Sequence, residues 1–179
     1  MRLSFARLEH LARLTLLFFA VAIPNAQCQT NVHAVLKLPG QRRAAPKLSL
    51  KDSLGEPLTL NQYTGKILLL DFWATWCHGC QEEIPWFSEF DRQYRAKGLS
   101  VIGVSLDEDG WKAVKPFIKT AAVPYRIVLG NHATASRYGI VGMPDTFLID
   151  RNGRIAAKYV GLVDRNDIEK NIQTMLAEK

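Results

Sequence analysis

The feature that most constrains this chain is an apolar run that leads directly into a pair of cysteines. Residues 67–73 are apolar except for Asp71, and Cys77 and Cys80 follow after a short connection. Near-continuous apolar runs are typical of strands that are buried on both faces of a sheet. A helical pattern then covers residues 81–95. This order predicts an α/β sheet with the two cysteines at a strand-to-helix turn.

Such a position would make the cysteines reactive. Unpaired backbone N–H groups and the helix dipole favour negative charge at a helix N-terminus, so they lower the pKa of a thiol and increase its thiolate fraction. Cys77 would occupy this position, and Cys80 would lie within reach, one turn later, to resolve a mixed disulfide. The pattern therefore predicts a redox-active dithiol.

Other uses of two cysteines at this spacing fit the chain less well. A structural zinc site needs four ligands, and the only further cysteine is Cys28. Covalent haem attachment requires a histidine directly after the second cysteine, where this chain has Gln81. Two buried cysteines acting as small hydrophobic residues remain an alternative, although a pair at a helix start is hard to keep inert.

The N-terminal residues follow the order of a secretory signal peptide. Arg2, Arg7 and Arg13 precede the apolar residues 14–23, and a short segment leads to Cys28. About ten apolar residues are too few to span a bilayer. An amphipathic first helix, the alternative, would need a polar face that this run lacks. We predict a signal peptide over residues 1–28, with the cleavage position left open.

We expect a soluble protein exported to the periplasm. Cys28 introduces lipid anchoring as an alternative, but Asn25 and Gln27 differ from the residues that lipoprotein signals resemble at those positions. Removal of residues 1–28 takes away three Arg and one Glu, which lowers the net charge from +6 to +4. This mild charge, without a basic stripe interleaved with aromatic residues, argues against nucleic-acid binding.

Beyond residue 28 the chain predicts one globular domain after a connecting segment. Its 179 residues, with 47% hydrophobic and 22% charged content, are sufficient for one core. Residues 29–45 have little periodicity and predict a linker or an extended arm. The domain would then cover residues 46–179.

Alternation and helical periodicity predict the elements of this domain. They are a hairpin that buries Leu48, Leu50, Leu58 and Leu60, strands at 67–73, 101–104 and 125–129, a helix at 81–95, a helix at 111–121 capped by Asp107 and Asp109, a short helix at 131–138 closed by Gly139, a hairpin of 146–149 and 155–160 around Asn152-Gly153, and a last helix that begins near Asp164 and buries Ile168, Ile172 and Leu176.

Several motifs together resemble a known fold. Residues 71–80, the following Pro85 and residues 138–144 look like the thioredoxin fold. The signal peptide, the leading hairpin, Glu83 and residues 147–153 narrow this to a resemblance to the TlpA/ResA family of extracytoplasmic thiol-disulfide oxidoreductases. The resemblance runs from about Pro46 to the C-terminus. It implies a thioredoxin-like α/β fold with an N-terminal β-hairpin extension and a mixed sheet flanked by helices.

The resemblance also assigns roles to the site residues. Cys77 would be the attacking thiolate and Cys80 the resolving thiol, and Glu83 matches a carboxylate that many exported members hold beside the dithiol. Asp71 matches the buried acid of cytoplasmic thioredoxins, where the exported family more often has asparagine, and either acid would help to deprotonate Cys80. Burial of Asp71 inside an apolar run would raise its pKa towards neutrality. The alternatives are a polar residue at a sheet edge for Asp71 and an exposed acid in the first helical turn for Glu83.

The same resemblance places a substrate-binding loop next to the dithiol. Met143 and Pro144 match a cis-proline loop that pairs with an extended substrate strand, and an ordinary trans turn is the alternative. Trp76 would shield the site. Asp145 departs from the threonine usual in the family. His78 would either stabilise the Cys77 thiolate or be solvated.

The predicted function is that of an exported reductase of protein disulfides, in cytochrome c maturation or in general periplasmic repair. No metal and no cofactor beyond the thiols is required, and the electrons would come from a membrane donor or another dithiol protein. The partners are disulfide-bearing substrate proteins, and we expect a monomer.

Two alternatives on the same fold remain open. A thiol peroxidase would have threonine three residues before the attacking cysteine, where this chain has Ala74. A copper-handling module would use the cysteines with a histidine, for which His33, His78 and His132 are candidates.

Overall fold

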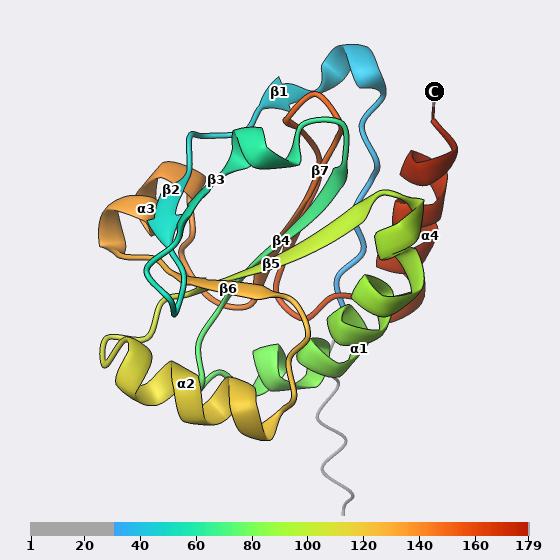
Figure 1. Ribbon diagram of the computed structural model, residues 1–179. Coiled ribbons are helices and arrows are strands. Elements are labelled where there is room, and N and C mark those ends of the chain that lie inside the picture. The colour runs from blue at the N-terminus through green and yellow to red at the C-terminus, as the bar shows by residue number, and fades with distance from the viewer. Residues whose placement is uncertain (1–30, 179) are drawn as a thin grey trace, which may run out of the picture.

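The computed structural model describes residues 31–178, which form a mixed sheet with helices on both faces (Figure 1). The strands are β1 (Arg43–Ala44), β2 (Ser49–Lys51), β3 (Pro57–Thr59), β4 (Ile67–Trp73), β5 (Leu99–Ser105), β6 (Arg126–Leu129), β7 (Asp145–Ile149) and β8 (Arg154–Val160). The helices are α1 (His78–Tyr94), α2 (Trp111–Thr120), α3 (His132–Tyr138) and α4 (Arg165–Ala177), with short 3-10 turns at Pro39–Gln41, Leu60–Tyr63 and Arg95–Lys97.

The main sheet has six strands in the order β1-β8-β7-β4-β5-β6. Strand β4 lies inside it, parallel to β5 and antiparallel to β7. In this register Asp71 is opposite Gly103 on one side and Thr146 on the other. Because β4 lies between β5 and β7, the residues that follow it can contact the loops at the ends of both neighbouring strands. This arrangement confirms the predicted thioredoxin-like α/β fold.

The alternation of β4 divides the core into two layers. Ile67, Leu69 and Trp73 face the layer that also contains the apolar residues of α1, α2 and α4. Leu68, Leu70 and Phe72 face the opposite layer, which is closed by α3 and by the separate β2–β3 hairpin. Because both faces of β4 are covered, all seven of its residues are buried, as an unbroken apolar run predicts.

Most of the predicted elements are confirmed. The N-terminal hairpin, the Asn152-Gly153 hairpin and the four helices are present. Helix α3 ends at Gly139, whose φ of 62° is in the left-handed region that closes helices. Helix α1 begins at His78, three residues before the predicted start, because Cys77 caps it.

Two details of the helices were predicted wrongly. Neither Asp107 nor Asp109 caps α2: its N-cap is Gly110, without a side-chain hydrogen bond. The Asp107 carboxylate is instead bonded to Thr75. In α4 the third buried residue is Met175 rather than Leu176, which is half-buried. The other two predicted residues, Ile168 and Ile172, are buried as expected.

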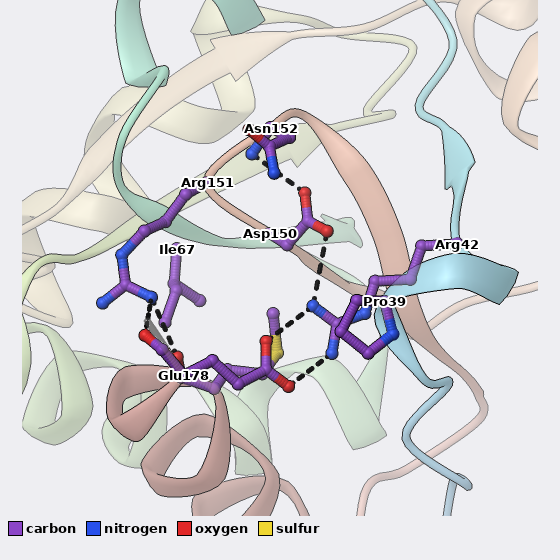
Figure 2. A pocket seen from close by; sticks show the side chains of 8 residues that line it. Pro39, Arg42, Ile67, Asp150, Arg151, Asn152 and Glu178 are labelled. Carbon is purple, nitrogen blue, oxygen red and sulfur yellow. Dashed lines mark hydrogen bonds and ion pairs between the residues drawn. The ribbon is translucent and has the colours of Figure 1, made fainter.

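The described part of the predicted linker or arm is extended and packs along the domain. Val32 forms a parallel bridge with Val163, and β1 pairs with β8 at the edge of the sheet. Arg42 is buried where this segment passes the C-terminal helix, and its guanidinium contacts Asp150 at 3.3 Å and Glu178 at 2.5 Å (Figure 2).

The predicted signal peptide, including Cys28, lies outside the described residues. Within residues 31–178, none of the helices has both the length and the apolar character needed to cross a bilayer.

Candidate active site

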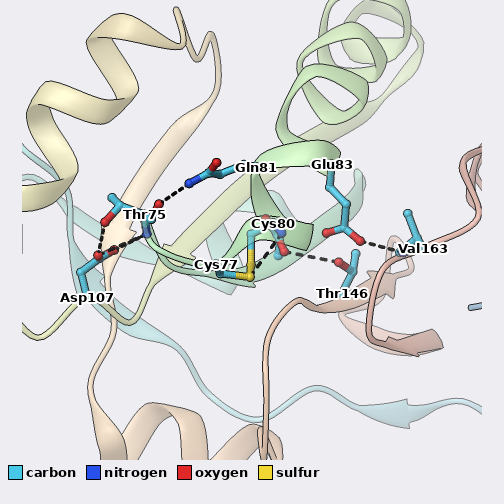
Figure 3. The surroundings of a disulfide bond; sticks show 9 residues. Thr75, Cys77, Cys80, Gln81, Glu83, Asp107, Thr146 and Val163 are labelled. Carbon is cyan, nitrogen blue, oxygen red and sulfur yellow. Dashed lines mark hydrogen bonds between the residues drawn. A yellow bond between two sulfur atoms is a disulfide. The ribbon is translucent and has the colours of Figure 1, made fainter. Parts of the chain in front are cut away.

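The two cysteines lie at the turn between β4 and α1, joined as a disulfide with a Cα–Cα distance of 5.3 Å (Figure 3). Cys77 is the N-cap of α1, and its Sγ accepts a hydrogen bond of 3.2 Å from the backbone N–H of Cys80. The exposed fraction is 6% for Cys77 and 0% for Cys80. Only Cys77 can therefore be approached from outside, and once reduced its sulfur would lie where the helix start stabilises a thiolate.

A buried aspartate fixes the turn that carries the cysteines. Asp107 accepts hydrogen bonds from the Thr75 backbone N–H at 3.1 Å and from its hydroxyl at 2.5 Å. The Ser105 hydroxyl donates to the same carboxylate at 2.8 Å. The Gln81 side-chain amide donates to the Thr75 carbonyl at 2.6 Å, which ties the turn to α1 (Figure 3). These bonds hold the position of Cys77 before a substrate arrives.

Asp71 lies deep in the sheet beneath this turn. It has no exposed surface, and the Thr146 hydroxyl donates to its Oδ1 at 3.4 Å. Burial raises the pKa of Asp71 to about 7, and the Thr146 hydrogen bond opposes part of that shift. Its strand is internal, so the alternative of an acid at a sheet edge is wrong, and the predicted rise of the pKa is confirmed.

Glu83 is also buried, on the face of α1 that packs against the core. Its Oε1 accepts a hydrogen bond of 2.7 Å from the backbone N–H of Val163 (Figure 3). Burial, together with repulsion from the nearby Asp71, raises the pKa of Glu83 to about 9, and the hydrogen bond from Val163 opposes part of that shift. The alternative of an exposed helix acid is therefore wrong.

The loop before β7 packs against the start of α1. The Met143–Pro144 peptide bond is cis, as predicted. A Cβ on Gly79 would lie 3.3 Å from Pro144 Cδ, so the absence of a side chain at Gly79 allows the loop to pack closely against the helix. Trp76 is 69% exposed and Val141 is 93% exposed. The turn that carries the dithiol and the loop that meets it at Gly79 thus each expose one large apolar side chain.

His78 and Asp145 have different surroundings from each other. The His78 imidazole is 80% exposed and lies 3.3 Å from the Glu82 carboxylate, so the solvated alternative describes it better. Asp145 is fully buried and pairs with Lys158 at 3.0 Å. Burial raises the pKa of Asp145, and Lys158 opposes this.

Comparison with known proteins identifies the chain. Residues 42–158 match the AhpC/TSA family. A thiol-disulfide oxidoreductase ResA of Geobacillus thermodenitrificans is 30% identical over 132 residues, which cover 73% of this chain and 75% of the relative. This chain is a thiol-disulfide oxidoreductase of the AhpC/TSA family. The thioredoxin-like protein YneN of Bacillus subtilis is 32% identical over 130 residues, covering 72% of this chain and 76% of the relative.

Solved structures support the same assignment. A Chlorobium tepidum protein assigned as the thiol:disulfide interchange protein DsbE superposes on this oxidoreductase with a TM-score of 0.68 and 34% identity. The match covers 76% of this chain and 97% of that protein. The resemblance to ResA-type oxidoreductases is thereby confirmed.

The thiol peroxidase and the copper-handling module can be compared with the residues around the dithiol. Ala74, three residues before Cys77, is fully buried. Among residues 31–178, no three potential metal-ligating side chains of the His, Cys, Asp or Glu type are grouped together. His33 is engaged with Asp167 at 3.4 Å. The geometry offers a copper module no ligand set in this part of the chain.

Three contacts of the oxidoreductase site were missed from the sequence. They are the bonds of Asp107 to Thr75, of Thr146 to Asp71 and of Val163 to Glu83. The contact between Asp107 and Thr75 could have been predicted from the pairing of the two parallel strands. Trp73 is paired with Ser105, and Thr75 and Asp107 each follow two residues after these. The other two depend on the packing of α1 and β7, which no local pattern shows.

Proposed function

We propose that this oxidoreductase is an exported reductase of protein disulfides. The observation that carries the proposal is the pair of buried acids with raised pKa values, Asp71 and Glu83, behind a dithiol of which only Cys77 reaches the surface. Such a site combines one nucleophile with groups that can hold or release protons near neutral pH.

The reaction proceeds by two exchanges of disulfide bonds. The Cys77 thiolate attacks one sulfur of the substrate disulfide, and the second substrate sulfur leaves as a thiolate that takes up a proton. Cys80 then gives its proton to a buried carboxylate and attacks Cys77 Sγ, which releases the first substrate sulfur. The substrate gains two electrons and two protons, and Cys77 and Cys80 become the disulfide. A membrane donor or another dithiol protein must reduce it again.

Asp71 favours the reducing direction. Strong thiol oxidants are driven by a stabilised thiolate in their reduced form. Here Asp71, whose pKa of about 7 leaves it partly ionised near neutral pH, would disfavour a Cys77 thiolate in surroundings where charges are poorly screened, whereas Glu83, with a pKa of about 9, is mostly neutral there. His78 is exposed and next to Glu82, so its influence on the thiolate is weakened by solvent.

We therefore expect a reduction potential more negative than about −200 mV, nearer to thioredoxin than to the strong oxidants. Equilibration of the protein with glutathione or dithiothreitol buffers measures this value. A potential near about −120 mV would instead make the protein an oxidase.

The surface around the dithiol fits an extended protein substrate. Trp76 and Val141 provide exposed apolar contacts, and the backbone next to Met143 and Pro144 can pair with a substrate strand. Large apolar side chains exposed beside a reactive group are typical of binding surfaces.

Export and the cellular pathway rest on the N-terminal pattern and on the type of relative. The charged, apolar and small-residue order of residues 1–28 supports secretion to the periplasm with cleavage of a signal peptide. The match to a protein assigned as DsbE supports a place among thiol-disulfide exchange reactions outside the cytoplasm, with cytochrome c maturation as one candidate pathway and general repair as the other.

Single cysteine variants test the reaction. Cys77→Ser should abolish the reduction of insulin disulfides, because the one cysteine of the dithiol that reaches the surface is lost. Cys80→Ser should instead accumulate mixed disulfides between Cys77 and its partners, which mass spectrometry can identify together with the substrate. Equal adduct formation by both variants would show that the roles are wrong. Consumption of hydrogen peroxide by the wild type without a protein substrate would favour the peroxidase.

A further inference from the structure

The segment between β8 and α4 connects two parts of the active site, the cis-proline loop and Glu83. The Gly161 N–H donates to the Pro144 carbonyl at 2.9 Å, which attaches the segment to the cis-proline loop. Two residues later the Val163 N–H donates to Glu83 at 2.7 Å. On its other side the same segment is bonded to the N-terminal arm, residues 31–37, by a bridge between Val32 and Val163.

The Leu162–Val163 peptide unit is hydrogen-bonded to the arm on one side and to Glu83 on the other. The Leu162 carbonyl accepts a hydrogen bond of 2.7 Å from the Val32 N–H. The N–H of that same peptide unit belongs to Val163 and donates to Glu83. Because a trans peptide is planar, its C=O and N–H point in opposite directions and move together. A hydrogen bond accepted at the carbonyl also polarises the N–H and makes it a better donor.

The arm is held in this position by further contacts. The Val32 carbonyl accepts from Asp164 N–H at 2.9 Å, and the Ala34 N–H donates to Asp167 at 3.1 Å. The Asn171 side chain donates to the Ala34 carbonyl at 3.0 Å. Val32, Ala34 and Leu36 pack against the core, and the residues between them are exposed. The arm therefore lies in one register with an inner and an outer face.

We infer that Val32 is a positioning residue for Glu83, and that the docked arm maintains, through the Leu162–Val163 peptide, the hydrogen bond on which the Glu83 carboxylate depends. The inference rests on the proposed role of Glu83 in resolving the mixed disulfide. When the arm leaves, the peptide is free to turn and its N–H becomes a weaker donor. Glu83 then keeps its proton to higher pH and accepts the Cys80 proton less readily.

Other charged groups around Glu83 must be taken into account. Asp71 approaches from β4 and Glu82 from its own helix, and both disfavour a second negative charge. Tyr125, before β6, is buried near both Asp71 and Glu83. On the arm itself, His33 is engaged with Asp167. Measurement on the oxidised protein removes the two thiols from the titration.

The test compares variants that differ in the arm N–H. Val32→Pro removes the donor to Leu162 and keeps an apolar side chain. Val32→Ala keeps the donor and removes apolar contact. Val35→Pro is the matched proline control, because Val35 is 88% exposed and its N–H has no backbone partner among residues 31–178. The amide proton shift of Val163 in oxidised protein, followed from pH 5 to pH 10 by NMR, reports the ionisation of Glu83 directly.

The Val163 titration midpoint should rise by about half a unit in Val32→Pro and stay unchanged in Val32→Ala and Val35→Pro. The rate of mixed-disulfide resolution below the midpoint should fall roughly threefold, the same free energy as half a pKa unit. Superimposable titrations of Val32→Pro and wild type would overturn the inference. If Val32→Pro loses its cooperative melting transition, Ala34→Pro, which removes the bond to Asp167, should give a shift of the same sign.

Failure of the proposed function would look different. Glu83→Gln, in a protein whose arm is unchanged, should slow the resolution of the mixed disulfide. If it does not, the role of Glu83 is wrong, whatever the arm does to the Val163 shift. If Glu83→Gln slows resolution but the arm variants leave the titration unchanged, only the role of Val32 is overturned.

Discussion

At the scale of single residues, the site depends on two carboxyls that are removed from water with few hydrogen bonds. Asp71 Oδ2 and Glu83 Oε2 have no hydrogen-bond partner within residues 31–178, and their other oxygens are bonded to Thr146 and Val163. A carboxyl in such a place is more stable protonated than ionised. Each can therefore carry a proton at a pH where an exposed acid has already lost it, and can exchange that proton with a thiol.

Asp71→Asn should slow the resolution of the mixed disulfide by about tenfold or more near neutral pH while the fold is retained. In the wild type the rate should rise through the Asp71 pKa of about 7, because only the ionised carboxylate accepts the Cys80 proton. Stopped-flow measurement from pH 6 to pH 9 checks both effects.

Asp91→Asn is the matched control, since Asp91 is also a buried acid but pairs with Arg95 near the far end of α1. Its profile should follow that of the wild type. An unchanged profile for Asp71→Asn would leave Asp71 a purely structural residue.

At the scale of elements, the strands could be predicted well because their pattern is local. The run at 67–73 was placed correctly since burial on both faces leaves only one signal, continuous apolarity. The turn at Asn152-Gly153 and the closing Gly139 were found because their backbone conformations require particular residues. The dithiol at the start of α1 followed from the same order of elements.

The environment of Glu83 could not be predicted in the same way. Its hydrogen-bond donor, Val163, is 80 residues away in the sequence. The helical period alone does place Glu83 on the apolar face of α1, because the buried Phe87 and Phe90 follow four and seven residues later, but it does not show which group contacts the carboxylate.

Gly103 in β5 permits the close packing of β4 and β6 around the base of the site. A Cβ at this position would lie 2.8 Å from Trp73 Nε1 and 2.5 Å from Ile127 Cδ1. The isoleucine end can rotate away, but the buried indole of Trp73 cannot. Gly103→Ala should therefore destabilise the protein by about 1–3 kcal/mol, and thermal unfolding should show a midpoint lower by several degrees.

Gly40→Ala serves as the control for this substitution, because a Cβ at Gly40 would meet nothing within 4 Å. Its midpoint should be unchanged or slightly higher, since alanine reduces the freedom of the unfolded chain. Equal midpoints for the two variants would show that β5 has room for a side chain at Gly103.

At the scale of the whole molecule, the C-terminal end of the described chain is tied to Arg42 near the start of β4, at the opposite end of that strand from the dithiol turn. Arg42, which follows the N-terminal arm, is paired with Asp150 after β7 and with Glu178 after α4 (Figure 2). Arg151 donates to the carbonyls of Met175 and Glu178, which end α4. These bonds fix α4, and with it the segment that reaches Glu83, against the sheet.

The buried acids should also make the stability of the whole protein depend on pH. In the unfolded chain Asp71 and Glu83 ionise near pH 4, whereas in the folded protein burial raises their pKa values to about 7 and about 9. Between these limits the folded state binds more protons than the unfolded state, so the free energy of unfolding falls as the pH rises. The loss begins near pH 4 and is complete above the folded-state pKa values.

Glu83→Gln should remove the larger part of this dependence, because glutamine can occupy the site without ionising. The variant should melt at a higher temperature than the wild type at pH 8, by about 2–4 °C for each kcal/mol gained in a protein of this size, and the difference should shrink towards pH 4.5. Calorimetry across this range checks the sign. A variant that is less stable than the wild type at pH 8 would mean that the ionised Glu83 stabilises the fold. The burial of Glu83 would then not be a loss of stability that the protein accepts for the sake of proton transfer.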